Sequence, residues 1–469
     1  MNPPALRNWT PGAACEPLVR VGVILAQDRA RVARVTLAGR PMRLVTNPPT
    51  NMAPPRRTLE VVATGGGLRL RVDARDERDV RNCRLEPPAP PAADATGVVV
   101  HDVVAGRGFH WQKRIDQTLP GTIEFTAHAN GVIAINELPL ELYLAGVITA
   151  EMSGACPADL LKAQCVVARS WLLAMTESKH AGDPFDRCND DCCQRYQGLA
   201  ALTPAARAAV LDTRGVVLLA APQPGAAPTR ARPRARILDA NYSKSCGGVS
   251  ELPRHVWGID KPGLSAVVDA PPDDAIHRFF PVTAANLRQY LTGDWLHTTR
   301  CFCSPNVVSP EVIGRYLGRV DEAGDYFRWK VRYTGDELAQ LLRSRLPEAR
   351  DVAFVRSLRV VARGVSGRAV RLELEWEDTG GRIITTTLAR EYRIREVLHR
   401  RFLYSSAIVF HVKHDCAGRI EDVTIVGAGW GHGAGMCQIG ALGMALSGYD
   451  YRAICAHYYP AAQLASVYE

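Results

Sequence analysis

The chain has 469 residues, of which 47% are hydrophobic and 22% are charged. This apolar fraction excludes a disordered protein, and the length excludes a mini-scaffold that needs staples to fold. No stretch approaches the roughly 18 apolar residues that span a bilayer. The formal charge of +9 suits acidic partners. Without a helix-turn-helix, zinc-finger or aromatic RNA-binding signature, however, nucleic acid is not an expected partner.

The first part of the chain reads as β-structure. Residues 18–84 alternate apolar and polar side chains, as in "VRVGVILAQ" and "LRLRVDAR", which predicts short antiparallel strands. A Pro/Ala-rich linker is expected over residues 85–97, and strands are expected to resume from Gly97 to Asn136. The six-residue apolar run after Met1–Arg20 is shorter than the hydrophobic region of a signal peptide, so we expect no export segment in this chain.

Helices dominate the next part. Pro139 stands near the start of a predicted helix, and Pro157–Ser178 is the clearest helix, because proline suits its first position. Another helix is expected to start at Thr203-Pro204 and to stop before Gly215, and the basic segment Ala221–Arg236 is expected to be a surface loop. Further helices are predicted near 283–292, 309–317 and 335–345, with strands at 326–333, 354–363, 369–376 and 382–388. The sequence therefore predicts a mixed α+β protein.

Glu151 is a candidate general acid. It lies between two predicted helices, after an apolar run and before Met152, Ser153 and Gly154. A carboxyl held in such a junction and partly desolvated is placed as a general acid requires. The alternative is a helix-capping or surface glutamate. Glu141, near a helix start, suits the helix dipole and is interpreted as structural.

A cysteine cluster indicates metal chemistry. His180, Cys188, Cys192 and Cys193 fall within fourteen residues, and sulfur with imidazole suits tetrahedral zinc. The metal would be structural, since the protein could fill all four positions. A local disulfide or buried thiols remain the alternatives.

Two glycine-containing loops have side chains suited to a sugar. The first, residues 241–258, presents Ser243 and Ser245 at the Gly247-Gly248 turn, near Trp257. In the second, residues 427–460, alternating glycines let the backbone approach a ligand, with Trp430, His432 and Gln438 facing it. The second loop lacks a Gly-Lys-Ser/Thr ending, so no organic cofactor is expected. A plain hairpin and a packing histidine are the alternatives.

Together these segments resemble the family of stage II sporulation protein D and the amidase-enhancer proteins. The matching residues are Leu138–Leu144, Glu151-Met152, Lys162–Gln164, Ala168-Arg169, Cys193–Gly198, Ser245–Gly248, Gly429–Ala441 and Gly448–Pro460. The alternation and the Pro/Ala-rich segment thus predict a β-rich region over residues 1–84 and a linker over 85–97. The resemblance covers about residues 97–469 and implies a two-lobed helix-and-strand catalytic domain with a central cleft over 98–469. Residues at about 260–400, between the third and fourth motifs, are then interpreted as an insertion into this domain.

The resemblance implies a lytic transglycosylase that cleaves cell-wall glycan, preferably stripped of stem peptides, into 1,6-anhydro products. It makes Glu151 the catalytic acid and then base. The substrate-binding residues would be Gln164, Arg169, Ser243, Ser245, Gly247, Gly248, Trp257, Trp430, His432 and Gln438. Two alternatives stay open: a non-catalytic wall-binding enhancer of a cell-wall amidase, and a zinc-dependent hydrolase. The family works in the cell envelope, on the periplasmic or wall side.

Some family members hold zinc just before the Cys-Gln-x-Tyr step, which supports His180, Cys188 and Cys193 as ligands. Family members often have histidine where this chain has Cys192. Cys246 and Cys437 replace small polar residues of the family motifs, and they would form a bridge or a thiol pair if the two motifs share a cleft. Cys301 and Cys303 have no assigned role.

Overall fold

A computed structural model describes most of the chain. The described residues are 6–37, 41–50, 54–89, 97–108, 112–129, 131–174, 176, 179–220, 237–317 and 324–469. The predicted loop Ala221–Arg236 and linker residues 90–96 lie outside them. The chain forms two compact units, one built mainly from the residues up to Val217 with Ala465–Glu469, the other mainly from Leu238–Leu464.

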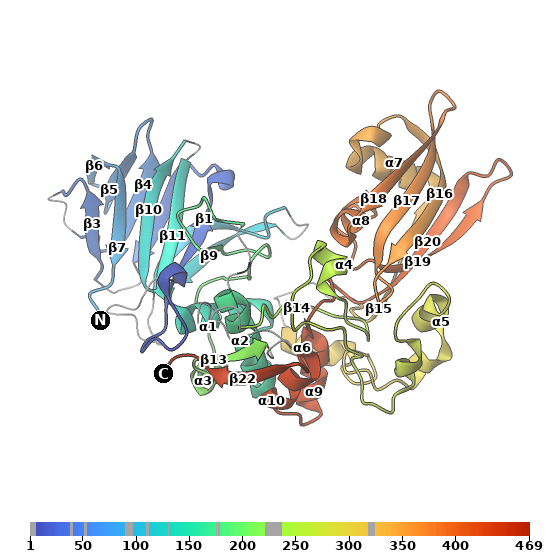
Figure 1. Ribbon diagram of the computed structural model, residues 1–469. Helices are drawn as coiled ribbons and strands as arrows, with labels where there is room; N and C mark the ends of the chain where they lie inside the picture. Colours follow the sequence, from blue (N-terminus) through green and yellow to red (C-terminus); the bar gives the residue numbers. More distant parts are fainter. Residues whose placement is uncertain are drawn as a thin grey trace, which may run out of the picture. The chain divides into compact units, whose positions relative to one another are not determined.

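The first unit contains two six-stranded sheets (Figure 1). One has the order β12-β1-β11-β10-β7-β3 and the other β6-β5-β4-β2-β8-β9. The strands are β1 (Leu18–Ile24), β2 (Val32–Leu37), β3 (Arg43–Asn47), β4 (Thr58–Ala63), β5 (Leu68–Val72), β6 (Asp76–Val80), β7 (Asn82–Glu86), β8 (Val98–Ala105), β9 (Lys113–Leu119), β10 (Thr122–His128), β11 (Gly131–Pro139) and β12 (Arg187–Cys188). The strands predicted over 18–84 are confirmed.

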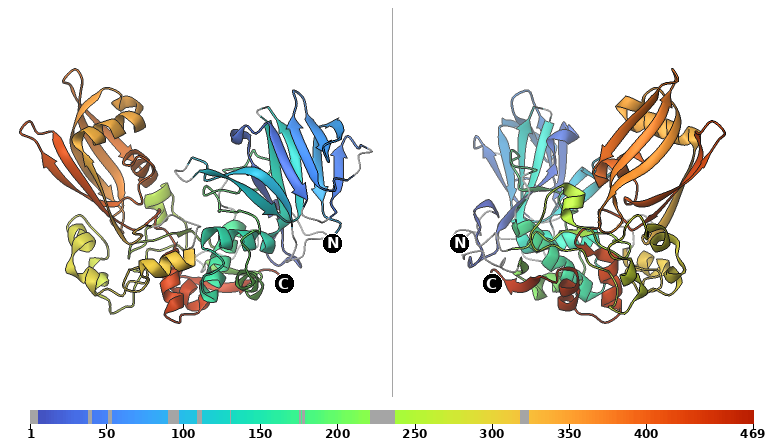
Figure 2. Two further views of the ribbon diagram at one scale, coloured as in Figure 1. Left: turned by 180° about the vertical axis from the view of Figure 1, so that it is seen from behind. Right: turned by 45° about the vertical axis from the view of Figure 1, so that its right-hand side comes forward.

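The two sheets pack face to face, because β11 of one contacts β2 and β4 of the other. The alternation read from the sequence places one apolar side chain in every two in the core, as in β5, where Leu68, Leu70 and Val72 are buried. Strands β2 and β8 pair, as do β7 and β10. Strands on both sides of the predicted 85–97 linker therefore belong to the same sheets, which Figure 2 shows from behind.

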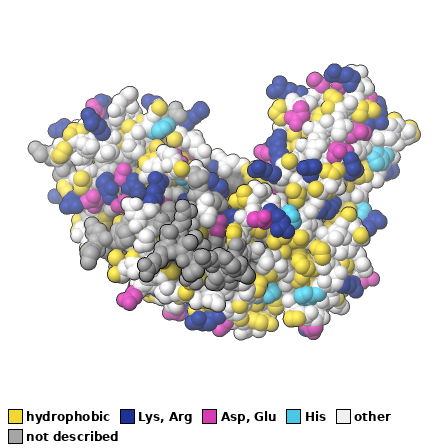
Figure 3. Space-filling model, in the orientation of Figure 1, with side chains coloured by type: hydrophobic (Ala, Val, Ile, Leu, Met, Phe, Trp, Pro, Cys, Tyr) yellow, Lys and Arg dark blue, Asp and Glu magenta, His cyan; other side chains and the backbone are white. Residues whose placement is uncertain are grey.

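Acidic partners offset the arginines on the outer face of the first sheet. Arg20 bridges Glu124 and Glu137 at 3.1 and 2.6 Å, and Arg84 bridges the same two carboxylates at 3.1 and 2.7 Å. Figure 3 shows basic and acidic side chains interspersed on the visible face of this unit. Neighbouring carboxylates thus partly neutralise the basic charge there.

The α-helices in the described residues of the first unit are α1 (Leu140–Glu151), α2 (Ala158–Ala174) and α3 (Pro204–Asp212). They pack on one another, and α1 continues directly from β11. As predicted, α3 begins at Thr203-Pro204, where the Thr203 hydroxyl accepts from the Ala206 N–H at 3.1 Å. No helix in the described ranges is long and apolar enough to cross a membrane.

The second unit combines small sheets with helices. Its elements are β14 (Tyr242–Ser243), α4 (Pro253–Trp257), α5 (Leu287–Thr292), α6 (Pro310–Leu317), β15 (Arg328–Thr334), α7 (Gly335–Arg345), β16 (Val352–Arg363), β17 (Ala369–Asp378), β18 (Ile383–Ala389), α8 (Glu391–Val397), β19 (Ala407–His414), β20 (Ile420–Ala428), β21 (Met436–Cys437), α9 (Gln438–Leu446) and α10 (Tyr451–Tyr458). Strands β13 (Val216–Ala220) and β22 (Ala462–Ser466) pair with each other.

Two three-stranded sheets of the second unit, β15-β20-β19 and β16-β17-β18, share one hydrophobic core with α7 and α8. Figure 1 shows these two helices beside the strands. Helix α7 begins with a capping box in which Thr334 and Glu337 each accept the other's backbone N–H. The predicted α+β class is confirmed, as are the helices and strands expected between 283 and 388.

Candidate active site

Glu151 is the last residue of α1, and its side chain is half-buried. The backbone N–H of Arg195 donates to Glu151 Oε1 at 3.0 Å. The Arg195 guanidinium pairs with Asp191 at 3.0 Å. Burial raises the pKa of Asp191 to about 6; Arg195 opposes this rise, and the charge of Glu151 adds to it. The helix end therefore has two interacting carboxyls, of which Glu151 is held by a backbone donor.

The segment that supplies this donor is fixed on both sides of Arg195. Gln194 Oε1 accepts from the Tyr143 hydroxyl at 3.2 Å, and its Nε2 donates to the Ala168 carbonyl at 3.2 Å. The Tyr196 hydroxyl donates to Asn136 Oδ1 at 2.7 Å, and its ring stacks on Tyr143 at 5.2 Å. The side chains of the Cys-Gln-x-Tyr motif thus anchor the segment, so that its backbone can orient Glu151.

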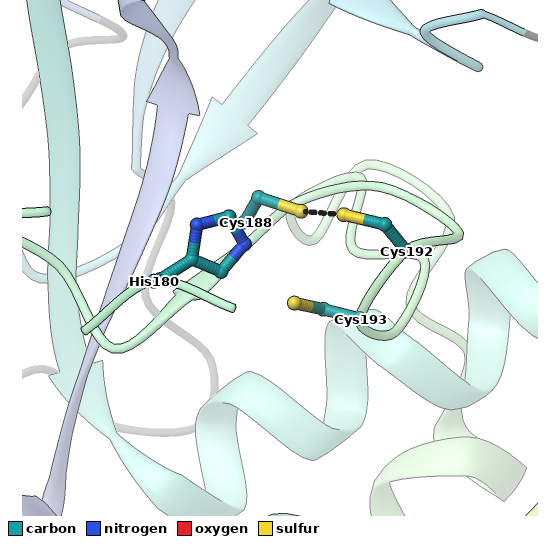
Figure 4. A group of neighbouring side chains, drawn as sticks. All are labelled: His180, Cys188, Cys192 and Cys193. Carbon is teal, nitrogen blue, oxygen red and sulfur yellow. Dashed lines mark hydrogen bonds between the residues drawn. The ribbon is translucent and has the colours of Figure 1, made fainter. Parts of the chain in front are cut away.

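The predicted metal ligands meet just before this segment. The ligand atoms of His180, Cys188, Cys192 and Cys193 all lie within 4.8 Å of one another (Figure 4). Asp183 Oδ2 lies 2.7 Å from His180 Nδ1, as carboxylates often orient metal-binding histidines through the ring nitrogen that does not bind the metal. One imidazole and three sulfurs suit a tetrahedral zinc ion. The structure therefore contains a possible metal-binding cluster at the predicted residues.

A strand pairing and backbone hydrogen bonds to the buried Asp190 carboxylate position this cluster. Gly22 of β1 is paired with Cys188 of β12. Asp190 accepts from the backbone N–H groups of Gly106 and Arg107, each at 2.8 Å. Hydrogen bonds from the Cys188 and Cys192 thiols lower the pKa of Cys193. A thiolate, the form that binds metals, is thus favoured at position 193.

Arg169 and Gln164 are buried on α2. The Arg169 guanidinium donates to both carboxylate oxygens of Glu141, at 2.9 and 2.5 Å, and to the Val216 carbonyl at 2.9 Å. Glu141 also accepts from the Tyr468 hydroxyl. A substrate contact by Arg169 would require this ion pair to open. The structural role predicted for Glu141 thus has a physical basis in the buried pair.

In the second unit, the Ser-Gly-Gly turn lies against the glycine-rich loop. Ser245 and Trp430 exchange backbone hydrogen bonds at 2.9 and 2.8 Å, and β14 pairs in parallel with β21. A Cβ on Gly247 would lie 2.7 Å from the Gly429 nitrogen, and one on Gly435 would collide with the Asn241 carbonyl. Both glycines have positive φ. They are needed because two backbones pack directly against each other here.

The predicted aromatic residues have accessible surface, whereas the serines have almost none. Trp257, Trp430 and His432 are partly exposed, while Ser243, Ser245 and Gln438 are buried. The Trp257 ring centroid lies 4.9 Å from that of His432. Trp430 stacks on Tyr404 at 4.3 Å. Aromatic faces are therefore the more accessible candidates for a sugar in this unit.

A buried network that the sequence did not predict holds the Ser-Gly-Gly turn. Glu251 accepts from the Ser366 N–H and hydroxyl at 3.2 and 2.6 Å, and lies 2.7 Å from His255 Nδ1. Arg368 donates to the Ser366 hydroxyl at 2.9 Å and to the Cys246 carbonyl at 3.3 Å. Glu251 follows the turn closely, but Arg368 lies more than a hundred residues away in a segment without a recognised motif.

Because of His432, we expect the free energy of unfolding to depend on pH. Although the ring of His432 keeps some exposed surface, the surrounding protein displaces most of the water around it and lowers its pKa to about 3, and the charges of Arg395, Arg368 and Lys261 act in the same direction. The unfolded chain takes up this proton near pH 6.5 and the folded chain does not. The free energy of unfolding should therefore fall as the pH drops from about 6.5 toward 3, by at most about 1.4 kcal/mol per pH unit from this group.

Urea unfolding at about pH 7.5 and about pH 5 measures this dependence. The variant His432→Gln should lose less stability than the wild type between the two conditions. Equal losses in both proteins would contradict the expectation.

Comparison with known proteins shows that the segment containing the helices of the first unit is similar to a described family. Residues 128–219 match the family described as "Stage II sporulation protein" (SpoIID). This segment contains Glu151, the Cys-Gln-x-Tyr motif and the cysteine cluster. The predicted recognition is confirmed over these residues: the chain contains a SpoIID domain, and this domain family is cell-wall-related.

The later part of the chain matches a family without a known function. Residues 255–435 match "Domain of unknown function (DUF8618)", which overlaps the insertion predicted at about 260–400. A relative, described as an uncharacterized protein of Brachyspira hyodysenteriae, is 24% identical over 339 residues, covering 72% of this chain and 70% of its own length. Neither description names an activity.

Proposed function

We propose that the protein is a lytic transglycosylase of peptidoglycan, that residues 98–469 carry this activity, and that Glu151 is its acid and base. The observation that carries the proposal is the half-buried Glu151 carboxylate, oriented by the Arg195 N–H from a fixed segment of the SpoIID domain. A positioned carboxyl of this kind is the group that general acid catalysis needs.

The reaction needs one such group. Protonated Glu151 donates its proton to the oxygen that links N-acetylmuramic acid to N-acetylglucosamine, and an oxocarbenium-like centre develops as that bond breaks. The resulting carboxylate then accepts the proton of the sugar's own 6-hydroxyl, whose oxygen closes the 1,6-anhydro ring. Because no water attacks, the second carboxylate of ordinary glycosidases is unnecessary. We propose that Trp257 and Trp430 of the second unit bind sugars of the glycan through their aromatic faces.

We propose that His180, Cys188, Cys192 and Cys193 hold a structural Zn²⁺. Four protein ligands leave no open position for catalysis. When bound, the metal would cross-link the loop that leads into the Cys-Gln-x-Tyr motif. Its ligand Cys193 lies two residues before Arg195, whose backbone N–H donates to Glu151. This site would therefore act on catalysis only through the position of Glu151.

The variant Cys192→Ser tests this metal site. We expect it to lose most of its metal, to melt at a lower temperature and to lose activity by about tenfold or more, because second ligand-shell changes alone cost 10–100-fold. Cys192→His should retain the metal, since imidazole also binds zinc. Cys416→Ser is the matched control, as Cys416 is exposed like Cys192 but lies outside the cluster. Lost activity at an unchanged melting temperature would instead indicate a zinc-dependent hydrolase.

Product analysis tests the activity itself. Purified full-length protein is incubated with glycan strands stripped of their peptides, and the products are identified by mass spectrometry. Fragments with 1,6-anhydro ends are expected, whereas reducing ends without the anhydro ring would show hydrolysis and overturn the proposal. Absence of fragments, together with faster turnover by a cell-wall amidase, would make the protein an enhancer. A wall substrate also requires a place in the cell envelope, on its periplasmic or wall side.

A further inference from the structure

A second group of ligand-type side chains lies in the second unit, apart from the cluster at His180. Cys246, Asp269, Cys303 and Cys437 come from four separate segments, and their ligand atoms all lie within 4.8 Å of one another. Each of the four residues is at most 1% exposed. All three thiols are free. Of the two predicted alternatives for Cys246 and Cys437, the bridge is not formed, and the two neighbouring thiols belong to a larger group.

The spacing within this group suits one metal ion. The sulfurs of Cys246 and Cys303 are 3.8 Å apart, and Cys246 Sγ lies 3.3 Å from Asp269 Oδ2. Tetrahedral zinc, with Zn–S of about 2.3 Å and Zn–O of about 2.0–2.2 Å, separates two sulfurs by about 3.8 Å and a sulfur from an oxygen by about 3.5 Å. A disulfide would bring two sulfurs to about 2.05 Å.

The surroundings of Asp269 aim one of its oxygens at the thiols. The Tyr458 hydroxyl donates to Asp269 Oδ1 at 2.6 Å, and His457 Nε2 lies 3.7 Å from the same oxygen. Oδ2 is thus the oxygen that faces Cys246. Such outer hydrogen bonds to one carboxylate oxygen are typical of metal-binding carboxylates.

Backbone donors surround the sulfurs as well. The Gly248 N–H donates to Cys246 Sγ at 3.3 Å. Cys437 Sγ accepts from the N–H groups of Cys246 and Gly440, at 3.2 and 3.3 Å. Cys437 is also the N-cap of α9, where the helix dipole favours negative charge. The two backbone donors and the helix dipole favour a thiolate at Cys437, and the thiolate is the form of cysteine that binds zinc.

The burial of the Asp269 carboxylate favours a cation beside it. Its carboxylate is fully buried, and in the described part of the chain its ion-pair partner is His457, which is charged only when protonated. An ionised carboxylate buried without a compensating charge is costly. A divalent cation among the thiolates would supply the missing positive charge.

We propose that Cys246, Asp269, Cys303 and Cys437 form a second, structural Zn²⁺ site. The donor set of three sulfurs and one oxygen favours zinc, and full burial leaves no position open to substrate. The site would fasten the Ser-Gly-Gly turn and the start of α9 to the segment that carries Cys303. It would thereby hold the two loops proposed to bind glycan in one arrangement.

Zinc content of the full-length chain tests this site. Wild type, Cys303→Ser and Cys301→Ser are purified under reducing conditions, incubated with Zn²⁺ alone and desalted before elemental analysis. Cys303→Ser should contain one zinc per chain less than the wild type. Cys301→Ser should match the wild type, because Cys301 is equally buried, is two residues away, and lies outside the group. Equal zinc in wild type and Cys303→Ser would overturn the proposal.

A second measurement covers the case in which Cys303→Ser does not fold. The double variant His180→Ala/Cys188→Ala removes ligands of the first cluster and leaves this group intact. X-ray absorption of its bound zinc should show three sulfur neighbours at about 2.3 Å and one lighter neighbour at about 2.0–2.2 Å. Absence of bound zinc, a zinc without sulfur neighbours, or a disulfide among the three cysteines would overturn the site.

Discussion

Glu151→Gln should abolish the release of anhydro-sugar ends from peptide-free glycan while the chain stays folded. Glutamine keeps the acceptor for the Arg195 N–H but cannot donate and retake the proton at the scissile oxygen. Loss of the acid should reduce the rate by about 10²- to 10⁴-fold. The measurement is the initial rate of anhydro-product formation by mass spectrometry, with glycan binding measured in parallel and expected to be unchanged.

Asp191→Asn is the matched control for this experiment. Asp191 is a neighbouring carboxyl whose pKa burial raises to about 6, so it is the obvious competitor for the role of acid. Its substitution removes the ion pair with Arg195 but leaves the Glu151 carboxyl in place. We expect a smaller loss than for Glu151→Gln. If Asp191→Asn were inactive and Glu151→Gln active, the assignment of Glu151 would be wrong.

Arg169→Met should destabilise the first unit by about 3–5 kcal/mol. The substitution leaves the Glu141 carboxylate buried without its bidentate partner, and removing one member of a buried ion pair typically costs this much. The Tyr468 hydroxyl and the Gly215 N–H, at 3.2 Å, would still donate to Glu141, but neither carries a positive charge. Urea unfolding, followed separately for each transition, measures the loss.

The double variant Glu141→Gln/Arg169→Met completes this test. It removes the stranded charge, so it should recover part of the stability lost in Arg169→Met. A double variant no more stable than Arg169→Met would show that lost packing, not an uncompensated charge, is the cause. A wild-type-like Arg169→Met would contradict the predicted role of the pair altogether.

Several family-motif residues support the site through contacts with other parts of the protein. Gln194 and Tyr196 fix the segment that orients Glu151, and Gly435 lets one backbone pass close to another. In this chain such residues are buried, whereas Trp257 and Trp430 keep exposed surface. Substitution of the buried residues should therefore lower stability as well as activity, and the two effects must be measured together.

The sequence by itself determined the features that depend on residues close together in the chain. Alternation over residues 18–84 predicted the strands, and Thr203-Pro204 predicted the start of α3. The grouping of His180, Cys188, Cys192 and Cys193 could be predicted because these residues lie within fourteen residues of sequence, so that one loop brings them together. Local propensity and spacing are sufficient for such features.

Only the tertiary structure decided which distant residues meet. Cys246 and Cys437 are 191 residues apart, and Asp269 and Cys303 join them although neither stands in a recognised motif. Likewise, Arg169 pairs with Glu141 28 residues earlier, and Tyr468 reaches the same carboxylate across 327 residues. The packing of whole helices and strands determines such partners. A buried charge or thiol needs a hydrogen-bond or ionic partner, and only residues that the tertiary fold places beside it can serve.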